Sequence, residues 1–210
     1  MENTNINPNR MELRKVREKV KVAKKGHGLL KDKTSGLIKI FYKVIKQTRD
    51  ERQEVEKELK SILEDFQNAM MSLKEEDISL LLTLSSEQIS LKYDEVSNMG
   101  AICPNNQIDG KIEKKTNYSP LSSNFQFDLV TKRFLELFPK IIELSNTEKS
   151  AYILADEIEK CKRRTKALEN VLIPQYESQI KRIEQKLSNN ELENTARLKT
   201  IKNKKKPNQK

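Results

Sequence analysis

Apolar and small residues recur along the first third of the chain in alternating steps of three and four positions. The series runs from Leu13 to Thr48 and, after a polar stretch, resumes from Val55 to Leu73. A repeat of about 3.5 residues is typical of a helix that supercoils against a partner helix, because it keeps one seam facing that partner. The pattern therefore predicts a long N-terminal coiled-coil helix, on the order of 90 Å at about 1.5 Å per residue.

A second seam of the same kind occupies the C-terminal part of the chain. It runs from Val130 to Leu187 and, more weakly, on to Ile201. The two seams have matching lengths, so we expect an antiparallel pair of helices with Leu13 near Ile201. Pro174 lies within the second seam and cannot donate a backbone hydrogen bond, so we expect a bend there.

Between the two seams the period changes to two residues, which is typical of a strand. Apolar and polar side chains alternate over most of 89–96, Ser97–Gly100 offers a turn, and Ala101–Cys103 can return as a second strand. This stretch predicts a β-hairpin. The fold class that follows is mainly α: a long antiparallel two-helix coiled coil with a small head, a short helix plus the hairpin, at the fold-back.

Helix-capping signals help to divide the chain. Asn9 with Glu12, and Ser123 with Gln126, have the spacing of capping boxes and are expected to open the two long helices. The predicted organisation has five parts: a flexible N-terminus (1–9), an N-terminal coiled-coil helix (10–75), a head (76–122), a C-terminal coiled-coil helix (123–203) and a basic flexible tail (204–210). Within the head we expect a short apolar helix at 78–84, a β-hairpin near 88–104 and a polar loop at 105–122.

Three glycines fall inside the first predicted helix, where each costs about 1 kcal/mol relative to alanine. Gly26, Gly28 and Gly36 indicate a close approach of a partner backbone, a bend, or simple tolerance within a long helix. His27, the only histidine, lies on the seam between them. No further ligand or nucleophile stands nearby in the sequence, so we interpret His27 as a packed or interface histidine.

The composition excludes several function classes. Apolar residues make up 35% of the 210 residues and charged residues 34%, which favours long helices over a thick core. No apolar run is long enough for a membrane span, and we expect no direct membrane insertion and no secretory signal. Cys103 and Cys161 have no second cysteine near either, so we expect reduced thiols, no metal site and no cofactor.

The net charge of +10 is unevenly distributed. Residues 1–40 carry 11 basic and 4 acidic side chains, residues 160–210 carry 15 and 5, and the middle carries 15 and 22. In an antiparallel pair the two basic segments would coincide and form a positive tip.

Three groups of residues stand in order along the chain. The first is Asn9–Leu13 followed by Ala23–Lys33, the second is Asn98–Pro104, and the third runs from Ala155 through Arg163-Arg164 and Ile173-Pro174 to Lys199. Together these groups resemble the D subunit of the V-type and archaeal-type ATPases. The resemblance spans residues 9 to about 203. The Lys- and Asn-rich stretch 105–118, together with Gly28, Gly36 and Cys103, departs from the family pattern.

The resemblance implies a central rotor axle without catalytic residues. Its partners would be the catalytic and non-catalytic nucleotide-binding subunits of a hexamer, the small F subunit of the stalk, and a subunit that caps the membrane ring. The chain would then be cytoplasmic and peripheral, and would couple ATP hydrolysis or synthesis to proton or sodium transport. The expected partner-binding residues are Arg14, Arg17, Lys24, Lys25, Lys31, Lys33, Arg163, Arg164 and Lys166.

Two other function classes remain as alternatives. A nucleic-acid-binding coiled coil would explain the basic segments, but acidic residues interrupt them and no aromatic residues alternate with the cations for base stacking. A purely structural coiled coil is the other alternative. An enzyme is not expected, because the chain has no Gly-rich phosphate loop and no Cys–His pair at useful spacing.

Overall fold

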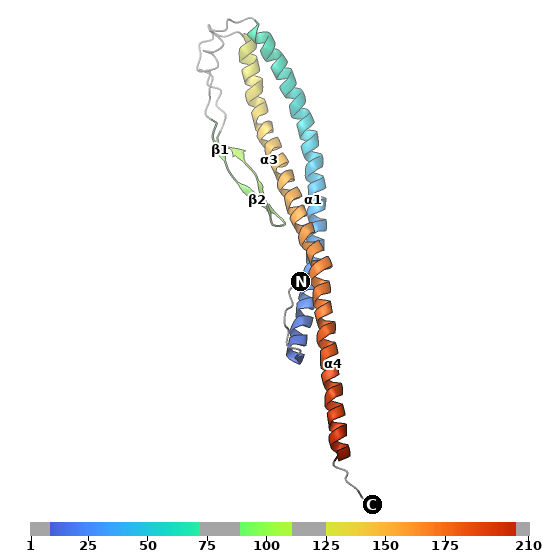
Figure 1. The fold of residues 1–210 in the computed structure, drawn as a ribbon. Coiled ribbons are helices and arrows are strands. Elements are labelled where there is room, and N and C mark those ends of the chain that lie inside the picture. Colours follow the sequence, from blue (N-terminus) through green and yellow to red (C-terminus); the bar gives the residue numbers. More distant parts are fainter. Residues whose placement is uncertain (1–8, 72–88, 111–124, 205–210) are drawn as a thin grey trace, which may run out of the picture. The chain divides into compact units, whose positions relative to one another are not determined.

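The computed structural model describes residues 9–71, 89–110 and 125–204 and is mainly helical (Figure 1). The predicted short helix at 78–84 and the cap at Ser123 lie outside the described residues. The elements are α1 (Arg10–Met70), β1 (Leu91–Lys92), β2 (Glu95–Asn98), β3 (Ala101–Pro104), β4 (Gln107–Ile108), α3 (Phe125–Ala167), the π-helix η1 (Leu168–Leu172) and α4 (Ile173–Lys204).

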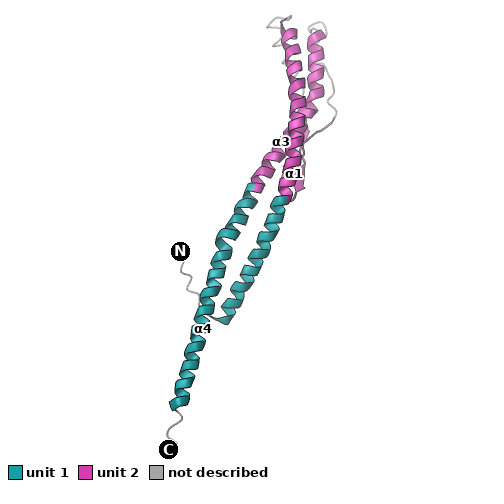
Figure 2. Ribbon diagram, turned by 90° about the vertical axis from the view of Figure 1, so that its right-hand side faces the viewer, with its two compact units in different colours: residues 1–35, 159–210 teal, residues 36–158 magenta. Residues whose placement is uncertain are grey.

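The chain divides into two compact units (Figure 2). Unit 1 comprises residues 1–35 and 159–210, and unit 2 comprises residues 36–158. In unit 1 the beginning of α1 packs against α4, and in unit 2 the remainder of α1 packs against α3. The predicted fold class, an antiparallel pair of long helices with a β-hairpin between them in the sequence, is confirmed.

The core of unit 2 is a cluster of side chains from the two seams. Val55 and Ile62 of α1 are buried with Val130 and Leu137 of α3, and these four side chains expose between 1% and 6% of their surface. Each such side chain contributes about 1.5–3 kcal/mol by leaving water. Partly buried side chains extend the cluster: Leu59, Phe66, Ile141 and Leu144.

The cap at Asn9 forms in part as the sequence predicts. The carbonyl of Asn9 accepts the first helical bond from the Leu13 amide at 3.0 Å, and its side-chain oxygen lies 3.5 Å from the Met11 amide. Glu12 instead accepts a hydrogen bond from Lys15 at 2.8 Å. The helix therefore begins at the expected residue, with the Glu12 carboxylate in its first turn, where negative charge stabilises a helix N-terminus.

The C-terminal helical stretch is interrupted by a π-helical turn just before Pro174. Within η1 the amide of Ile173 donates to the carbonyl of Leu168, five residues earlier. In a regular α-helix the ring of Pro174 would meet the carbonyl of Asn170. The wider π turn relieves that contact, and the helix then resumes as α4.

The hairpin is built on a two-residue turn. Met99 and Gly100 both have positive φ angles, 51° and 86°, as a turn of the mirror-image type requires. Beyond the turn, β2 pairs antiparallel with β3, and β1 pairs with β4 through Leu91 opposite Ile108. Strand β4 lies within the stretch 105–122 that the sequence predicts as loop, because Ile108 has an apolar partner across the ladder.

One face of the hairpin is buried within unit 2. On β3 the side chains of Ala101 and Cys103 are each 3% exposed, while Ile102 between them is 57% exposed. Just after β3, the amide of Asn106 donates to the Asn146 side-chain oxygen at 3.1 Å, and the Asn146 amide group donates to the Asn106 carbonyl at 2.8 Å. The hairpin is thus attached to α3 by two reciprocal hydrogen bonds.

Candidate partner-binding surface

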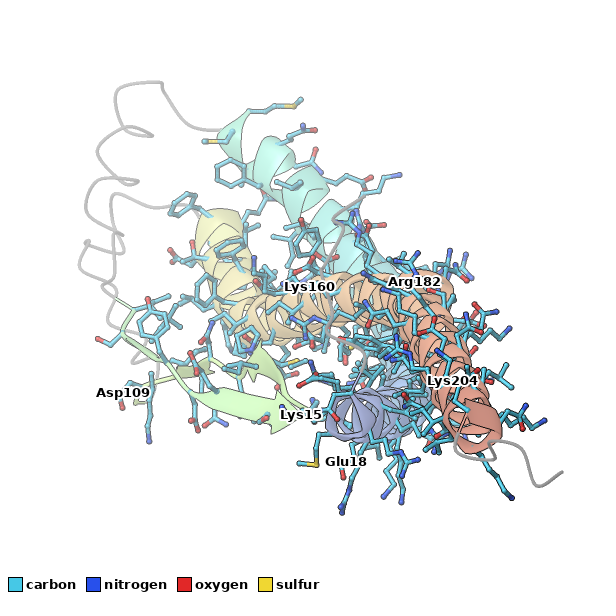
Figure 3. All side chains as sticks on the ribbon, turned by 60° about the horizontal axis from the view of Figure 1, so that its bottom comes forward. Lys15, Glu18, Asp109, Lys160, Arg182 and Lys204 are labelled. Carbon is cyan, nitrogen blue, oxygen red and sulfur yellow. The ribbon has the colours of Figure 1, made fainter. Side chains whose placement is uncertain are left out.

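The basic residues of the chain are concentrated in unit 1. Residues 1–35 and 159–210 carry 25 basic and 10 acidic side chains, whereas residues 36–158 carry 16 and 21. All nine predicted partner-binding residues belong to unit 1. Figure 3 shows charged side chains projecting around this part of the chain, among them Lys15 on α1 and Arg182 and Lys204 on α4.

Three ion pairs join α1 to α4 at intervals of seven residues on both helices. They are Arg10–Glu191 at 2.8 Å, Arg17–Glu184 at 2.7 Å and Lys24–Glu177 at 2.8 Å. A seven-residue interval places each pair at the same level of successive heptads, beside the apolar seam. In an antiparallel pair the partner numbers must fall as the first numbers rise, as they do here. These pairs therefore define the register of the two helices in unit 1.

This register corrects the sequence-based expectation that Leu13 lies near Ile201. The ion pairs place the beginning of α1 opposite residues 177–191, about two heptads away from the predicted partner. The ion pairs put Leu13 level with residue 188, 13 residues before Ile201. Because the two seams repeat every seven residues, this shift of nearly two heptads pairs nearly equivalent positions. Apolar pattern alone could not distinguish the two registers.

A consequence of the register is that α4 extends beyond its last ion pair with α1. Every residue from 188 to 204 is exposed, including Leu192 (65%), Leu198 (65%) and Ile201 (51%). Basic side chains stand among them: Arg197, Lys199, Lys202 and Lys204. None of these residues is among the nine that the sequence predicts to bind a partner. The seam weakens after Leu187, and this was the one sequence signal for an unpaired end of the helix. Its meaning becomes clear only when the register of the two helices is known.

The ion pairs sort the predicted partner-binding residues into two groups. Arg17 and Lys24 contact α4, while Arg14 pairs with Glu18 and Arg163 with Glu159 within one helix. The Lys24 ammonium, through its hydrogen bond and its charge, lowers the pKa of the Glu177 carboxyl. Such exposed pairs contribute little stability each. The charges of these four residues are thus partly compensated within the chain.

The remaining predicted residues have a different environment. Lys33 is half-buried and has an interaction partner of its own. Four others are exposed and form no ion pair with the described residues: Lys25, Lys31, Arg164 and Lys166. These four present uncompensated positive charge to the solvent.

The single histidine is half-buried beside an acidic residue of the C-terminal helical stretch. His27 Nε2 lies 3.7 Å from Glu169 Oε2, and its side chain is 24% exposed. Among residues 9–71, 89–110 and 125–204 there is no group of three or more His, Cys, Asp or Glu side chains that could hold a metal ion. None of the described helices has the length and apolar character needed to cross a membrane.

Comparisons with known proteins identify one family over nearly the whole chain. The family model of the ATP synthase D subunit matches residues 12–203. The D subunit of the A-type ATP synthase of Methanobrevibacter smithii is 35% identical over 200 residues, covering 93% of this chain and 86% of that protein. The D subunit of the V-type ATP synthase of a Thermoanaerobacter species is 36% identical over 198 residues, covering 94% and 95%. The corresponding V-type D subunit of Clostridium botulinum is 34% identical, with 94% of each covered.

Proposed function

The chain belongs to the family of ATP synthase D subunits, and we propose that it is the central rotor axle of a V-type ATPase or ATP synthase. In this role it performs no chemistry. It couples ATP hydrolysis or synthesis in a hexamer of catalytic and non-catalytic subunits to proton or sodium transport through a membrane ring. The observation that carries the proposal is the family match over residues 12–203 together with the antiparallel helix pairs of both units.

The basic surface of unit 1 is the part that we propose to enter the hexamer. Lys25, Lys31, Arg164 and Lys166 are exposed and uncompensated by the described residues, so they remain available for acidic or carbonyl groups of a surrounding sleeve. We retain all nine predicted residues as contacts and rank these four first. Arg17 and Lys24 have in addition the role of holding α1 against α4.

The exposed end of α4 supports the same proposal. Residues 192–204 combine exposed apolar side chains with four cations, which suits a bearing that meets both apolar and polar groups. A single exposed helix gains stability from such a partner, because most helical stability in proteins comes from packing. We propose that this end of α4 lies deepest in the hexamer.

The remaining partners follow from the same proposal. The small F subunit of the stalk would bind beside the middle of the chain, and the head at residues 76–122 would rest on the subunit that caps the membrane ring. The chain would then be a peripheral component on the cytoplasmic face of the membrane. The predicted division at residues 10–75, 76–122 and 123–203 is part of this proposal.

The test is charge reversal in the assembled complex. Lys25, Lys31, Arg164 and Lys166 are all changed to Glu, and assembly, ATP hydrolysis and ion pumping are measured in the same preparation. We expect either loss of the hexamer from the purified complex or ATP hydrolysis that no longer drives ion movement. The matched control reverses four exposed lysines of unit 2, Lys39, Lys43, Lys57 and Lys60, with the same change in net charge.

Two results would contradict the proposal. Equal defects in both variants would show that net charge matters and the location does not. Unchanged coupling in the unit 1 variant would show that these cations do not contact the hexamer. The nucleic-acid alternative, which the comparisons do not favour, predicts binding to DNA or RNA that weakens steeply with salt.

A further inference from the structure

The turn of the hairpin contains a residue that the turn itself does not explain. Met99 has a φ of 51°, in a region where side chains other than Asn and Asp are uncommon. Two-residue turns of this type favour Asn followed by Gly. Gly100 meets that preference and Met99 does not. We therefore expect the Met99 side chain to make a favourable contact outside the turn.

A second residue with an unfavourable local conformational preference lies next to Met99, on α1. Gly36 lies in the interior of the helix, where glycine is a poor helix former. A Cβ at this position would lie 2.7 Å from Met99 Cε and 2.9 Å from Met99 Sδ. At Gly26 and Gly28, by contrast, an added Cβ would meet nothing within 4 Å. Of the three glycines in the predicted helix, Gly36 alone has the close approach.

The thioether of Met99 thus occupies space that exists because residue 36 has no side chain. Two residues that are each locally unfavourable meet at one contact within unit 2. A conflict with local preference that recurs at both partners of a contact is expected where the contact itself has a role. We call this contact between Met99 and Gly36 the Met99 latch.

The hairpin depends on the helices of unit 2 for its position. A two-stranded hairpin is marginally stable by itself in water, so its place is determined by what it packs on. At its base it is held by the reciprocal Asn106–Asn146 hydrogen bonds, and along β3 by the buried side chains of Ala101 and Cys103. The Met99 latch holds the other end, at the turn.

We propose that the Met99 latch is an oxidation-sensitive contact. A hydroperoxide releases the hairpin from α1 by oxidising the Met99 thioether. Met99 is 47% exposed, so a small oxidant has access to the residue. In the reaction one peroxide oxygen bonds to Sδ while the O–O bond breaks. The sulfur loses two electrons, and the second oxygen of hydrogen peroxide leaves with both protons as water.

Oxidation of Met99 releases the hairpin because the sulfoxide is larger and more polar than the thioether. Oxidation adds an oxygen atom to a sulfur that lies 2.9 Å from the place of a Cβ on Gly36, where no further atom fits on the glycine side. It also converts an apolar side chain into a polar one, which favours water over the surface of α1. Two thiols of a methionine sulfoxide reductase supply the electrons that reduce the sulfoxide, becoming a disulfide while the oxygen leaves as water, and this restores the thioether and closes the latch.

The test uses the full-length chain, dilute hydrogen peroxide and amide hydrogen exchange. Mass spectrometry of peptides locates the sulfoxide. The Asn106 amide reports attachment to α3, and amides of the β2–β3 ladder report whether the hairpin itself stays folded. We expect exchange at Asn106 to become about tenfold faster after oxidation of Met99. We also expect faster alkylation of the buried Cys103 thiol, with the buried Cys161 of unit 1 as the internal reference.

Substitutions separate the latch from general oxidation. Met99→Leu should make exchange at Asn106 insensitive to peroxide, although the other methionines still oxidise. Gly36→Ala should mimic oxidation without peroxide, because the added Cβ displaces the flexible thioether, and Gly26→Ala is the matched control. Met99→Asn improves the turn while removing the latch, so the ladder amides should exchange more slowly and Asn106 faster.

Any one of three outcomes overturns the proposal. The first is a Met99 sulfoxide with unchanged exchange at Asn106 and unchanged alkylation of Cys103. The second is a Met99 that resists peroxide under conditions that oxidise Met11, which is 61% exposed. Equal effects of Gly36→Ala and Gly26→Ala would likewise show that Gly36 has no special role.

Discussion

Lys24 Nζ lies 2.8 Å from Glu177 Oε1, and this pair joins α1 to α4 in unit 1. It belongs to the series of three pairs whose seven-residue interval defines the register of the two helices. Both side chains are about half exposed. The pair therefore selects which residues face one another more than it adds to stability.

The first prediction concerns the loss at low pH of the stability that this pair contributes. The hydrogen bond from Lys24 lowers the pKa of Glu177 in the folded chain, so its stabilising contribution is present above the unfolded pKa, about 4.3. It is lost as the pH falls through the lowered folded pKa. The thermal midpoint of Glu177→Gln should therefore lie below that of the parent chain at pH 7, and the two should converge at low pH. A difference that persists unchanged under acid would contradict this account.

The second prediction concerns the alkaline limit of a pair in unit 2. Lys140 on α3 donates to Glu58 at 2.7 Å and to Glu54 at 3.1 Å on α1, and these bonds raise its pKa, Glu58 most. Its contribution is present below the unfolded pKa, about 10.4, and is lost as the pH rises through the raised folded pKa. Lys140→Gln should lower the thermal midpoint at pH 8 and have no effect at sufficiently alkaline pH. An equal deficit at both pH values would exclude this origin.

The third prediction compares two neighbouring apolar residues of α1. Ile62 is 4% exposed within the core of unit 2, whereas Leu63 is 51% exposed. Ile62→Ala should cost about 2–5 kcal/mol in the free energy of unfolding, because it leaves a cavity beside Val130 and Leu137. Leu63→Ala should change it by about 0.5 kcal/mol or less. Chemical denaturation of both variants provides the measurement, and similar losses would mean that the seam lies elsewhere.

The fourth prediction separates a glycine of the turn from a glycine of the helix. Gly100 has a φ of 86°, so Gly100→Ala should destabilise the hairpin by about 1–2 kcal/mol and speed exchange of its ladder amides. Gly28 lies in α1 with open space around it, and Gly28→Ala should stabilise the helix by up to about 1 kcal/mol. Thermal unfolding and hydrogen exchange distinguish the two effects. A destabilising Gly28→Ala would reveal a close contact at that position.

Local sequence signals predicted much of the secondary structure. The Asn9 cap, the 3.5-residue seams and the alternation before Gly100 depend on residues close together in the chain, and helix α1 and the hairpin follow from them. The short strand β4 was missed because two residues carry no readable period. The π turn was missed too, since Pro174 signals a disturbed helix without specifying how the backbone accommodates it.

The positive charge of the candidate surface could be predicted from the sequence. Which of its cations are free to bind a partner could be predicted only in part. Counting charges along the chain placed the cations of residues 1–40 and 160–210 together. It could not tell that Arg17 and Lys24 pair with Glu184 and Glu177 while Lys25 and Lys31 form no such pair. Neighbouring residues on a helix point in different directions, so which of them meets a carboxylate depends on the partner helix.

By itself, the sequence determined the helices, the hairpin, the family and the concentration of positive charge, because each depends on local pattern or on composition. The tertiary structure alone decided the register of α1 against α4 and the contact of Met99 with Gly36. A seam that repeats every seven residues satisfies equally well any shift by whole heptads. Only the interhelical ion pairs and the packing of distant segments select one arrangement, and both exist only once the chain has folded.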